Sequence, residues 1–178
     1  MGGRKTRRCA GNISTSDSKA ALVYLKGRQD IDGERILLHA QSLGGAFGAR
    51  LMAEHQEIRA GIFVSAFTSW RDATAGVLRA SGNPGLFMRA ISSILMPSWY
   101  DPIDDLPRIT DRTILIIHGT DDAVVPFAHG ERLYEVCRMV NPQVKFRSVQ
   151  GGDHNSLRWI DSSLDGEMTE FFRIAARE

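Results

Sequence analysis

The sequence has few cysteines and no long apolar run, and each absence excludes a class of protein. Cys9 and Cys137 are too few for a disulfide framework and lack the spacing of a metal site. The apolar runs are far shorter than the ~18–20 residues that a membrane-spanning helix needs, and no apolar leader opens the chain. We therefore expect a protein without a membrane span that works in a reducing, cytoplasmic compartment.

An excess of charge is also missing. The 22 Lys and Arg residues nearly balance the 21 Asp and Glu residues, so the net charge is +1 at pH 7. Nucleic-acid-binding proteins usually carry a strongly basic surface, so nucleic acid is not an expected partner. No glycine-rich phosphate loop and no metal-spaced His or Cys cluster occurs, and we expect no cofactor and no metal. The 178 residues are enough for one domain with a sizeable core.

Residues 36–48 (ILLHAQSLGGAFG) have the pattern of a nucleophile elbow. Apolar residues typical of a short buried strand are followed at once by Ser42, then by glycines and a helical run. A strand, a sharp turn with serine at its tip and a helix are the context that presents a serine as a nucleophile.

Small residues around Ser42 suit such a turn. We expect a Cβ at Gly44 to crowd the turn, and we expect Gly45 and Gly48 to let the helix lie close to the sheet. Ala40 departs from the G-x-S-x-G pattern, because it stands where the first glycine is usual.

Four apolar runs predict the strands of a mainly parallel sheet. They lie at residues 36–38, 61–65, 113–118 and 144–149. Near-continuous apolar strands that alternate with helices are typical of a parallel sheet covered on both faces. Helices are expected from Asp17 to about Gly27, after the elbow, over 127–139, and in two pieces between 155 and 176 broken at Asp165-Gly166.

Two segments lie outside this alternation. Residues 1–16 are basic and have no hydrophobic period, so they are predicted to be a flexible tail before a domain of residues 17–178. Residues 66–112 form a cap-like insertion with helices expected over 69–80 and 86–96. The apolar side chains of this insertion either pack on the core as a helix pair or line an acyl pocket, and both interpretations can hold together.

Three chemically useful residues fall just past the carboxyl ends of predicted strands. They are Ser42, Asp122 and His154, and ligand sites form at this edge of open α/β sheets. A serine hydroxyl needs an imidazole to take its proton, and the imidazole needs a carboxylate to fix its tautomer. The chain order Ser, Asp, His is the one associated with hydrolase elbows.

Each residue also has a structural alternative. Ser42 can cap the helix that follows it, Asp121 or Asp122 can cap the helix after Pro126, and His154 can be a turn residue with its ring in solvent. The other histidines lack a matching context, and His118 among them is interpreted as structural. They are His39, His55, His118 and His129.

Longer pieces of the chain resemble the α/β-hydrolases, in the branch of serine aminopeptidase-like and monoacylglycerol-lipase-like proteins. The pieces are DGERILLHAQSLGGAFGARLMAEH, IRAGIFVSAFTS, YDPIDDLPRI, ILIIHGTDDAVVPFAHGERLY and GGDHNSL, which cover most of residues 17–160. In that family the acid is the aspartate of G-x-x-D-x-x-V-P, which selects Asp122 over Asp121 here. The resemblance therefore implies Ser42 as nucleophile, Asp122 as orienting acid, His154 as base and the Leu43 N–H as an oxyanion donor.

The resemblance covers only the C-terminal portion of the family pattern. Intact members have several strands before the elbow strand, and an early loop there supplies a second oxyanion donor. The 35 residues before Ile36 contain one predicted helix and no predicted strand. We therefore expect a partial α/β-hydrolase fold, with about four mainly parallel strands flanked by helices and a small helical cap.

Two consequences follow from that expectation. Losing one oxyanion donor typically costs ~10²–10³ in turnover. The elbow strand would also become an apolar, unpaired sheet edge, at which we expect homodimer formation or poor solubility.

Two functions are consistent with the sequence. The first is a serine hydrolase that cleaves a carboxylic ester, thioester or amide of a small-molecule acyl substrate through an acyl-enzyme on Ser42. The second is a catalytically impaired, truncated homologue that acts as an interaction module or fragment. The apolar residues of the insertion favour an acyl or aromatic group over a sugar or phosphate.

Overall fold

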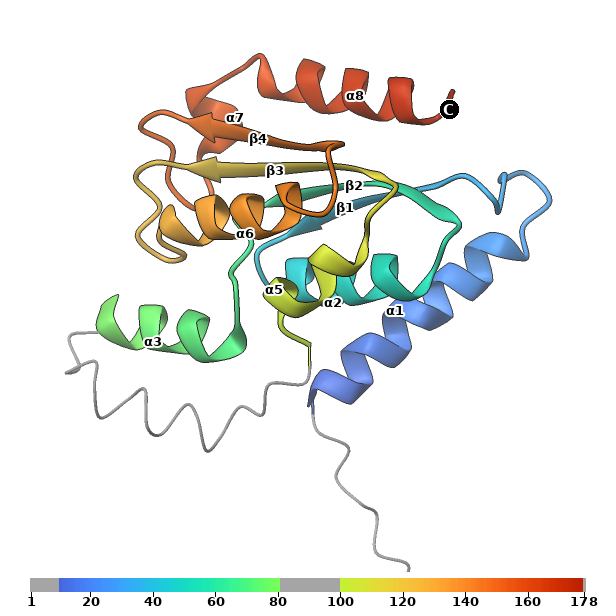
Figure 1. Cartoon of the computed structure of the whole chain (residues 1–178), viewed down its shortest axis with the longest axis horizontal. Helices are drawn as coiled ribbons and strands as arrows, with labels where there is room; N and C mark the ends of the chain where they lie inside the picture. The colour runs from blue at the N-terminus through green and yellow to red at the C-terminus, as the bar shows by residue number, and fades with distance from the viewer. Residues whose placement is uncertain (1–9, 81–99, 178) are drawn as a thin grey trace, which may run out of the picture.

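The computed structural model describes residues 10–80 and 100–177, and one parallel β-sheet forms its centre (Figure 1). The strands are β1 (Ile36–Gln41), β2 (Ile58–Val64), β3 (Thr113–Gly119) and β4 (Val144–Val149). They lie side by side in that order, each parallel to its neighbour. The α/β class and the four parallel strands are confirmed, and β4 has the predicted bounds.

Helices cover both faces of the sheet. On one face α2 (Leu43–Glu54) contacts β1 and β2, and α6 (Ala128–Arg138) contacts β3 and β4. On the other face α8 (Leu164–Ala175) lies above the strands in Figure 1 and follows the short helix α7 (Leu157–Ile160). The remaining elements are α1 (Ala10–Lys26) beside α2, α3 (Trp70–Ala80), α5 (Pro102–Asp105) and the 3-10 turn η1 (Leu106–Arg108).

Side-chain alternation in the strands explains the two covered faces. In β3, Ile114 and Ile116 belong to the core under α2 and α6, whereas Leu115 and Ile117 belong to the core under α8. Successive side chains of a strand point to opposite faces, so a strand buried on both faces is apolar throughout. β1 differs, because in the described part of the chain it pairs with β2 alone and forms the sheet edge that the sequence predicted.

The predicted start of the first helix is wrong. α1 begins at Ala10, so residues 10–16 are helical rather than part of a flexible tail, and residues 1–9 lie outside the described residues. The packed part of α1 lies further along, where Leu22 is buried and Lys19 forms an ion pair with Glu54 of α2 at 2.6 Å. Extending a helix that has already formed needs no new nucleation step and adds one backbone hydrogen bond for each residue fixed.

The predicted break near the C-terminus is misplaced. Two helical pieces are present, but the chain turns at residues 161–163, and Asp165 and Gly166 lie in the first turn of α8. The turn is stabilised by Asp161 Oδ1, which accepts from the Ser163 N–H (3.0 Å) and hydroxyl (2.6 Å). An acidic residue also suits the first turn of a helix, where the backbone N–H groups are free.

The cap-like insertion is described only in part. The helix predicted over 69–80 is present as α3, whereas the helix predicted over 86–96 lies outside the described residues.

The strand register brings the carboxyl ends of the strands to one edge of the sheet. Gln41 of β1 is level with Val64 of β2, and Val64 is level with Ile117 of β3. Gly119 of β3 is level with Val149 of β4. The loops that follow β1, β3 and β4 therefore open on the same edge, where the predicted site residues lie.

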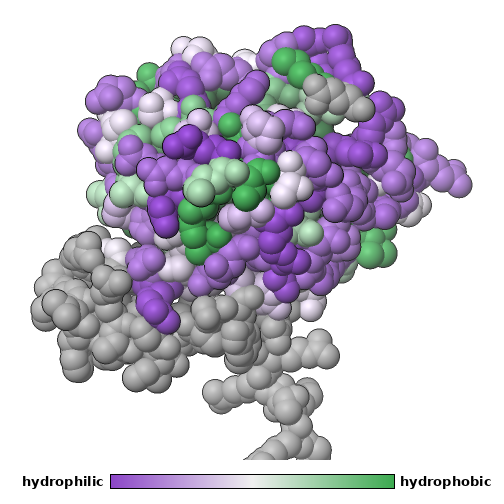
Figure 2. Space-filling view, viewed as in Figure 1, coloured by the Kyte–Doolittle hydropathy of each residue, from purple (hydrophilic) through white to green (hydrophobic). Residues whose placement is uncertain are grey.

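The face of the molecule drawn in Figure 2 is largely hydrophilic, with a small hydrophobic patch near its centre. Over residues 10–80 and 100–177, every helix is too short or too polar to cross a membrane.

Candidate active site

Ser42 occupies the sharp turn between β1 and α2. Its backbone has φ 52° and ψ −118°, a conformation that costs a non-glycine residue roughly 1–3 kcal/mol. The Ser42 N–H donates to the Val64 carbonyl (2.9 Å), and the Ser42 carbonyl accepts from the Gly45 N–H (2.9 Å). Bonds to the neighbouring strand and to the first helical turn therefore hold the strained serine in place.

Close packing of α2 on the sheet explains two of the three elbow glycines. A Cβ on Gly45 would lie 2.8 Å from the Ala66 Cβ, and a Cβ on Gly48 would lie 2.9 Å from the Ala40 Cβ. The predicted close approach is confirmed, and Ala40 is accommodated because Gly48 faces it. The expectation for Gly44 is wrong, since a Cβ there would have no atom of the described chain within 4 Å.

His154 lies on the loop after β4. Hydrogen bonds within this loop fix its conformation. Asp153 Oδ1 accepts from the N–H groups of Asn155 (2.9 Å) and Ser156 (2.8 Å), and the Ser156 hydroxyl accepts from the Asp153 N–H (3.2 Å). Gly151 begins this turn with φ 73°, a region that glycine adopts without strain. The backbone that carries His154 therefore has a fixed conformation.

Asp122 lies in the turn after β3 as a buried carboxylate. Its Oδ1 accepts from the N–H groups of Val124 (3.0 Å) and Val125 (2.8 Å). The turn is joined to the histidine loop by the Asp121 N–H, which donates to the Gly152 carbonyl (3.0 Å). The side chain of Asp121 itself lies at the surface, so only Asp122 of the two acidic residues points inward.

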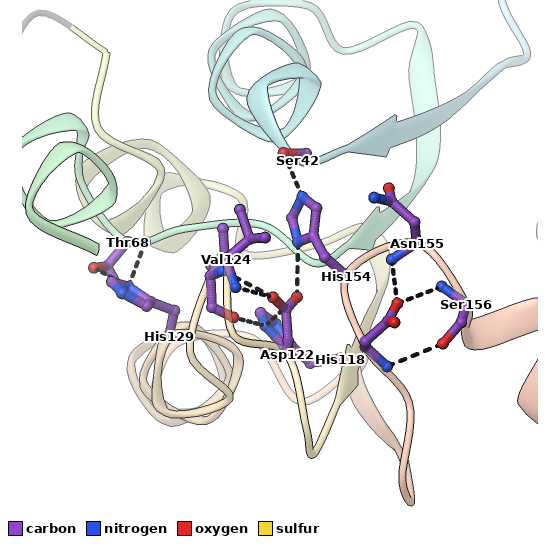
Figure 3. A network of polar contacts seen from close by, with 11 residues as sticks. Ser42, Thr68, His118, Asp122, Val124, His129, His154, Asn155 and Ser156 are labelled. Atoms are coloured by element: carbon purple, nitrogen blue, oxygen red, sulfur yellow. Dashed lines mark hydrogen bonds and ion pairs between the residues drawn. The ribbon is translucent and has the colours of Figure 1, made fainter. Parts of the chain in front are cut away.

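The structure brings Ser42, Asp122 and His154 together (Figure 3). His154 Nε2 lies 2.9 Å from Ser42 Oγ, and His154 Nδ1 lies 2.8 Å from Asp122 Oδ2. An ionised carboxylate can only accept, so Nδ1 carries the hydrogen and Nε2 is free to accept from the serine hydroxyl. This is the tautomer that a general base acting on Ser42 needs.

The surroundings of Asp122 keep it ionised. Burial alone would raise its pKa, but hydrogen bonds from His118, His154 and the Val125 N–H outweigh burial and lower the pKa below its ordinary value. At neutral pH the group is therefore a carboxylate that can hold the imidazole.

The structural alternatives do not account for these side chains. Ser42 stands at the N-cap position of α2, but its side chain makes no capping hydrogen bond. Asp122 bonds N–H groups of its own turn rather than the start of α6, whose N-cap residue is Phe127. The His154 ring is buried rather than in solvent.

Two further histidines lie near the triad candidates, of which His118 contacts Asp122 and His129 pairs with Thr68 (Figure 3). His118 lies at the end of β3, with Nε2 2.8 Å from the Val125 carbonyl and 3.5 Å from Asp122 Oδ2. His129 of α6 accepts from the Thr68 N–H at 3.2 Å, and burial lowers its pKa. In the sequence, a contact between His118 and Asp122 is indicated only by position: His118 lies at the end of the strand that precedes Asp122, four residues before it.

Leu43 begins α2 directly after the nucleophile candidate. The first N–H groups of a helix have no acceptor within the helix, so the Leu43 N–H is free to bind an external oxygen. Its side chain is exposed beside the elbow.

A cavity of about 570 Å³ opens beside His154. Polar groups of Gln41 and Asn155 and the apolar side chains of Trp159 and Met168 lie in its wall. In the described ranges, no group of three or more His, Cys, Asp or Glu residues is placed to hold a metal ion.

A parallel sheet with a serine elbow, an acidic turn after a later strand and a histidine loop after the next defines the α/β-hydrolase class. The chain belongs to the prolyl oligopeptidase family, whose model matches residues 4–173. The superfamily that the sequence predicted is therefore confirmed.

Curated relatives share this fold class. The chain is 35% identical to the α/β hydrolase domain-containing protein WAV2 of Arabidopsis thaliana, over 84% of this chain and 48% of that protein. It is 32% identical to the α/β hydrolase domain-containing protein 17B of Homo sapiens, over 84% of this chain and 46% of that protein. The chain thus spans about half the length of these curated relatives.

Solved structures agree on the fold. The esterase Pf2001 of Pyrococcus furiosus superposes with a TM-score of 0.75 and 20% identity, over 92% of this chain and 62% of that one. An acylaminoacyl peptidase of Pyrococcus horikoshii superposes with a TM-score of 0.65 and 18% identity, over 88% and 27% of the two chains. At these identities the likeness shows the fold alone.

Proposed function

We propose that the chain carries the catalytic triad of a serine hydrolase that cleaves a carboxylic ester, thioester or amide of a small-molecule acyl substrate. The observation that carries the proposal is the continuous relay from Ser42 through His154 to Asp122, with heavy-atom distances of 2.9 and 2.8 Å. Membership of the prolyl oligopeptidase family supports the same reaction class.

The relay supplies each proton transfer of an acyl-enzyme reaction. Ser42 Oγ attacks the carbonyl carbon while His154 Nε2 takes the hydroxyl proton, and Asp122 stabilises the imidazolium that forms. When the tetrahedral intermediate collapses, His154 returns the proton to the leaving alcohol, thiol or amine. A water molecule, deprotonated by the same imidazole, then releases the acid and restores the serine.

The oxygen that becomes negative in the intermediate needs hydrogen-bond donors. We assign one of them to the Leu43 N–H, because it follows the nucleophile at the N-terminus of α2. The positive end of the helix dipole favours negative charge at that point.

A fluorophosphonate probe tests the proposal, because it reacts covalently with an activated serine. We expect the folded chain to be labelled and mass spectrometry to place the label on Ser42. Ser42→Ala should abolish labelling, whereas Ser148→Ala, at an exposed serine of β4, should be labelled like the parent chain. Absence of labelling in folded protein, or equal labelling of Ser42→Ala, would reject the proposal.

A further inference from the structure

The Asp122 carboxylate is approached by two imidazoles rather than one. His154 Nδ1 and His118 Nε2 lie 2.8 and 3.5 Å from the same oxygen, Oδ2. The two rings come from different places, His154 from the loop after β4 and His118 from β3 itself. His118 is fully buried, so it cannot meet a substrate.

His118 also anchors the turn that contains the acid. Its Nε2 lies 2.8 Å from the Val125 carbonyl, and the Val125 N–H donates to Asp122 Oδ1 at 2.8 Å. Val125 is therefore held at both backbone groups, one by His118 and one by the carboxylate. The single ring thus contacts the acid directly through Oδ2 and indirectly through the backbone that holds Oδ1.

The packing around His118 leaves its ring one orientation. A Cβ on Gly130 would lie 2.7 Å from His118 Nδ1, so α6 closes against that side of the ring. Phe127 meets it edge-on, with ring centroids 6.1 Å apart. Nδ1 has no hydrogen-bond partner in the described chain, and the Val125 carbonyl can only accept, so the hydrogen lies on Nε2.

We infer that His118 is a positioning residue: its Nε2–H holds the Val125 carbonyl, and with it the Val125 N–H that donates to Asp122 Oδ1, so that Oδ2 faces His154. The inference rests on the proposed hydrolase function. The His154 Nδ1–H already donates to Oδ2, so the contribution of His118 is to fix the backbone donor at Oδ1, which stops the carboxylate from rotating. His118 thereby acts on the reaction through Asp122 and touches no reacting atom.

A matched pair of variants separates positioning from simple packing. In His118→Gln the amide nitrogen reaches the place of Nε2 and keeps the donor, whereas His118→Leu fills similar volume without one. We expect His118→Leu to lower kcat about 10–100-fold, the range found for groups that orient metal-ligating side chains, with KM unchanged. His118→Gln should recover most of the rate.

A readout without turnover keeps this test separate from the test of the proposed function. The proton between His154 Nδ1 and Asp122 gives a far-downfield NMR resonance while that bond is intact. We expect the parent chain and His118→Gln to show it and His118→Leu to lose it. If the parent chain shows the resonance but is not labelled by the probe, the hydrolase proposal fails while the positioning inference stands.

A second variant leaves the chemistry of His118 unchanged. Gly130→Ala pushes a methyl group against the ring, so it should move the resonance and lower kcat in the same direction as His118→Leu. Gly166→Ala adds the same methyl group in α8, where no atom of the described chain lies within 4 Å, and serves as the control. If folded His118→Leu and Gly130→Ala both keep the resonance and the parent kcat, the inference is overturned.

Discussion

Replacing Asp122 by asparagine tests the relay at the bond that fixes the tautomer of His154. Two backbone N–H groups donate to Oδ1, so the amide oxygen of the variant takes that place and its NH₂ group faces His154. The NH₂ group and the His154 Nδ1–H are both donors, and they would face each other where the parent atoms lie 2.8 Å apart. The imidazole relieves the conflict by moving its hydrogen to Nε2.

The size of the effect follows from that change of tautomer. With hydrogen on Nε2, His154 cannot take the proton of Ser42, and the corresponding change in a serine protease lowers kcat about 10⁴-fold. At about 1.4 kcal/mol for each factor of ten, the barrier rises by about 5.5 kcal/mol. Because aspartate and asparagine have similar shapes, the fold should be retained.

The assay is the rate of probe labelling, or of ester hydrolysis, measured together with circular dichroism. Asp121→Asn makes the same chemical change one residue earlier on an exposed side chain, and we expect it to react at the parent rate. A loss of less than tenfold in folded Asp122→Asn would refute the reasoning, because the carboxylate would then not govern His154.

Three other predictions concern stability and association. Gly45→Val should destabilise the fold by about 1–3 kcal/mol in urea unfolding, because its Cβ would lie 2.8 Å from the Ala66 Cβ. Asp122 has a lowered pKa, so it stabilises the fold above the unfolded-state pKa near 4; this contribution should fall as the pH drops from about 5 toward the folded pKa. The β1 edge should support a homodimer in sedimentation. His39→Pro should abolish this dimer, because proline has no N–H to pair with a second chain. The Ser42 N–H donates to Val64 of β2, so by alternation the His39 N–H points away from β2 toward the open edge.

Each of these predictions has a control. Gly44→Ala, with open space around its Cβ, should leave the urea midpoint unchanged or raised, and an equal loss there would contradict the packing explanation. Asp122→Asn should flatten the pH dependence of unfolding, and an unchanged slope would show that other groups cause it. A parent chain that sediments as a stable monomer would rule out association through β1.

Much of the fold could be predicted because the strands have local patterns of apolar residues. Val144–Val149 alternates and ends at glycines, and its bounds were predicted without error. The start of α1 could not be predicted from apolar periodicity, because residues 10–16 have no hydrophobic period and extend a helix whose packed residues, Lys19 and Leu22, lie further along. The break before α8 depends on side-chain bonds of Asp161, which residue preferences do not encode.

The candidate site shows the same division. Ser42, Asp122 and His154 follow predicted strands, so the parallel order was enough to place them at one edge. The contact of His118 with Asp122 depends on the path of the turn after β3, which residue patterns do not determine. The open surroundings of Gly44 were missed because a turn motif states which residues occur, not which neighbours surround them.

The bond between Ser42 and His154 joins residues 112 positions apart. It forms only when β1 and β4 have both joined the sheet, and a slip of β1 by one residue would turn its side chains to the opposite face. Reactivity of one hydroxyl therefore reports the fraction of molecules whose whole sheet is assembled. In a refolding experiment, the return of probe labelling at Ser42 would measure when the sheet is completed. The helix signal in circular dichroism, which local segments produce earlier, would be a separate measurement.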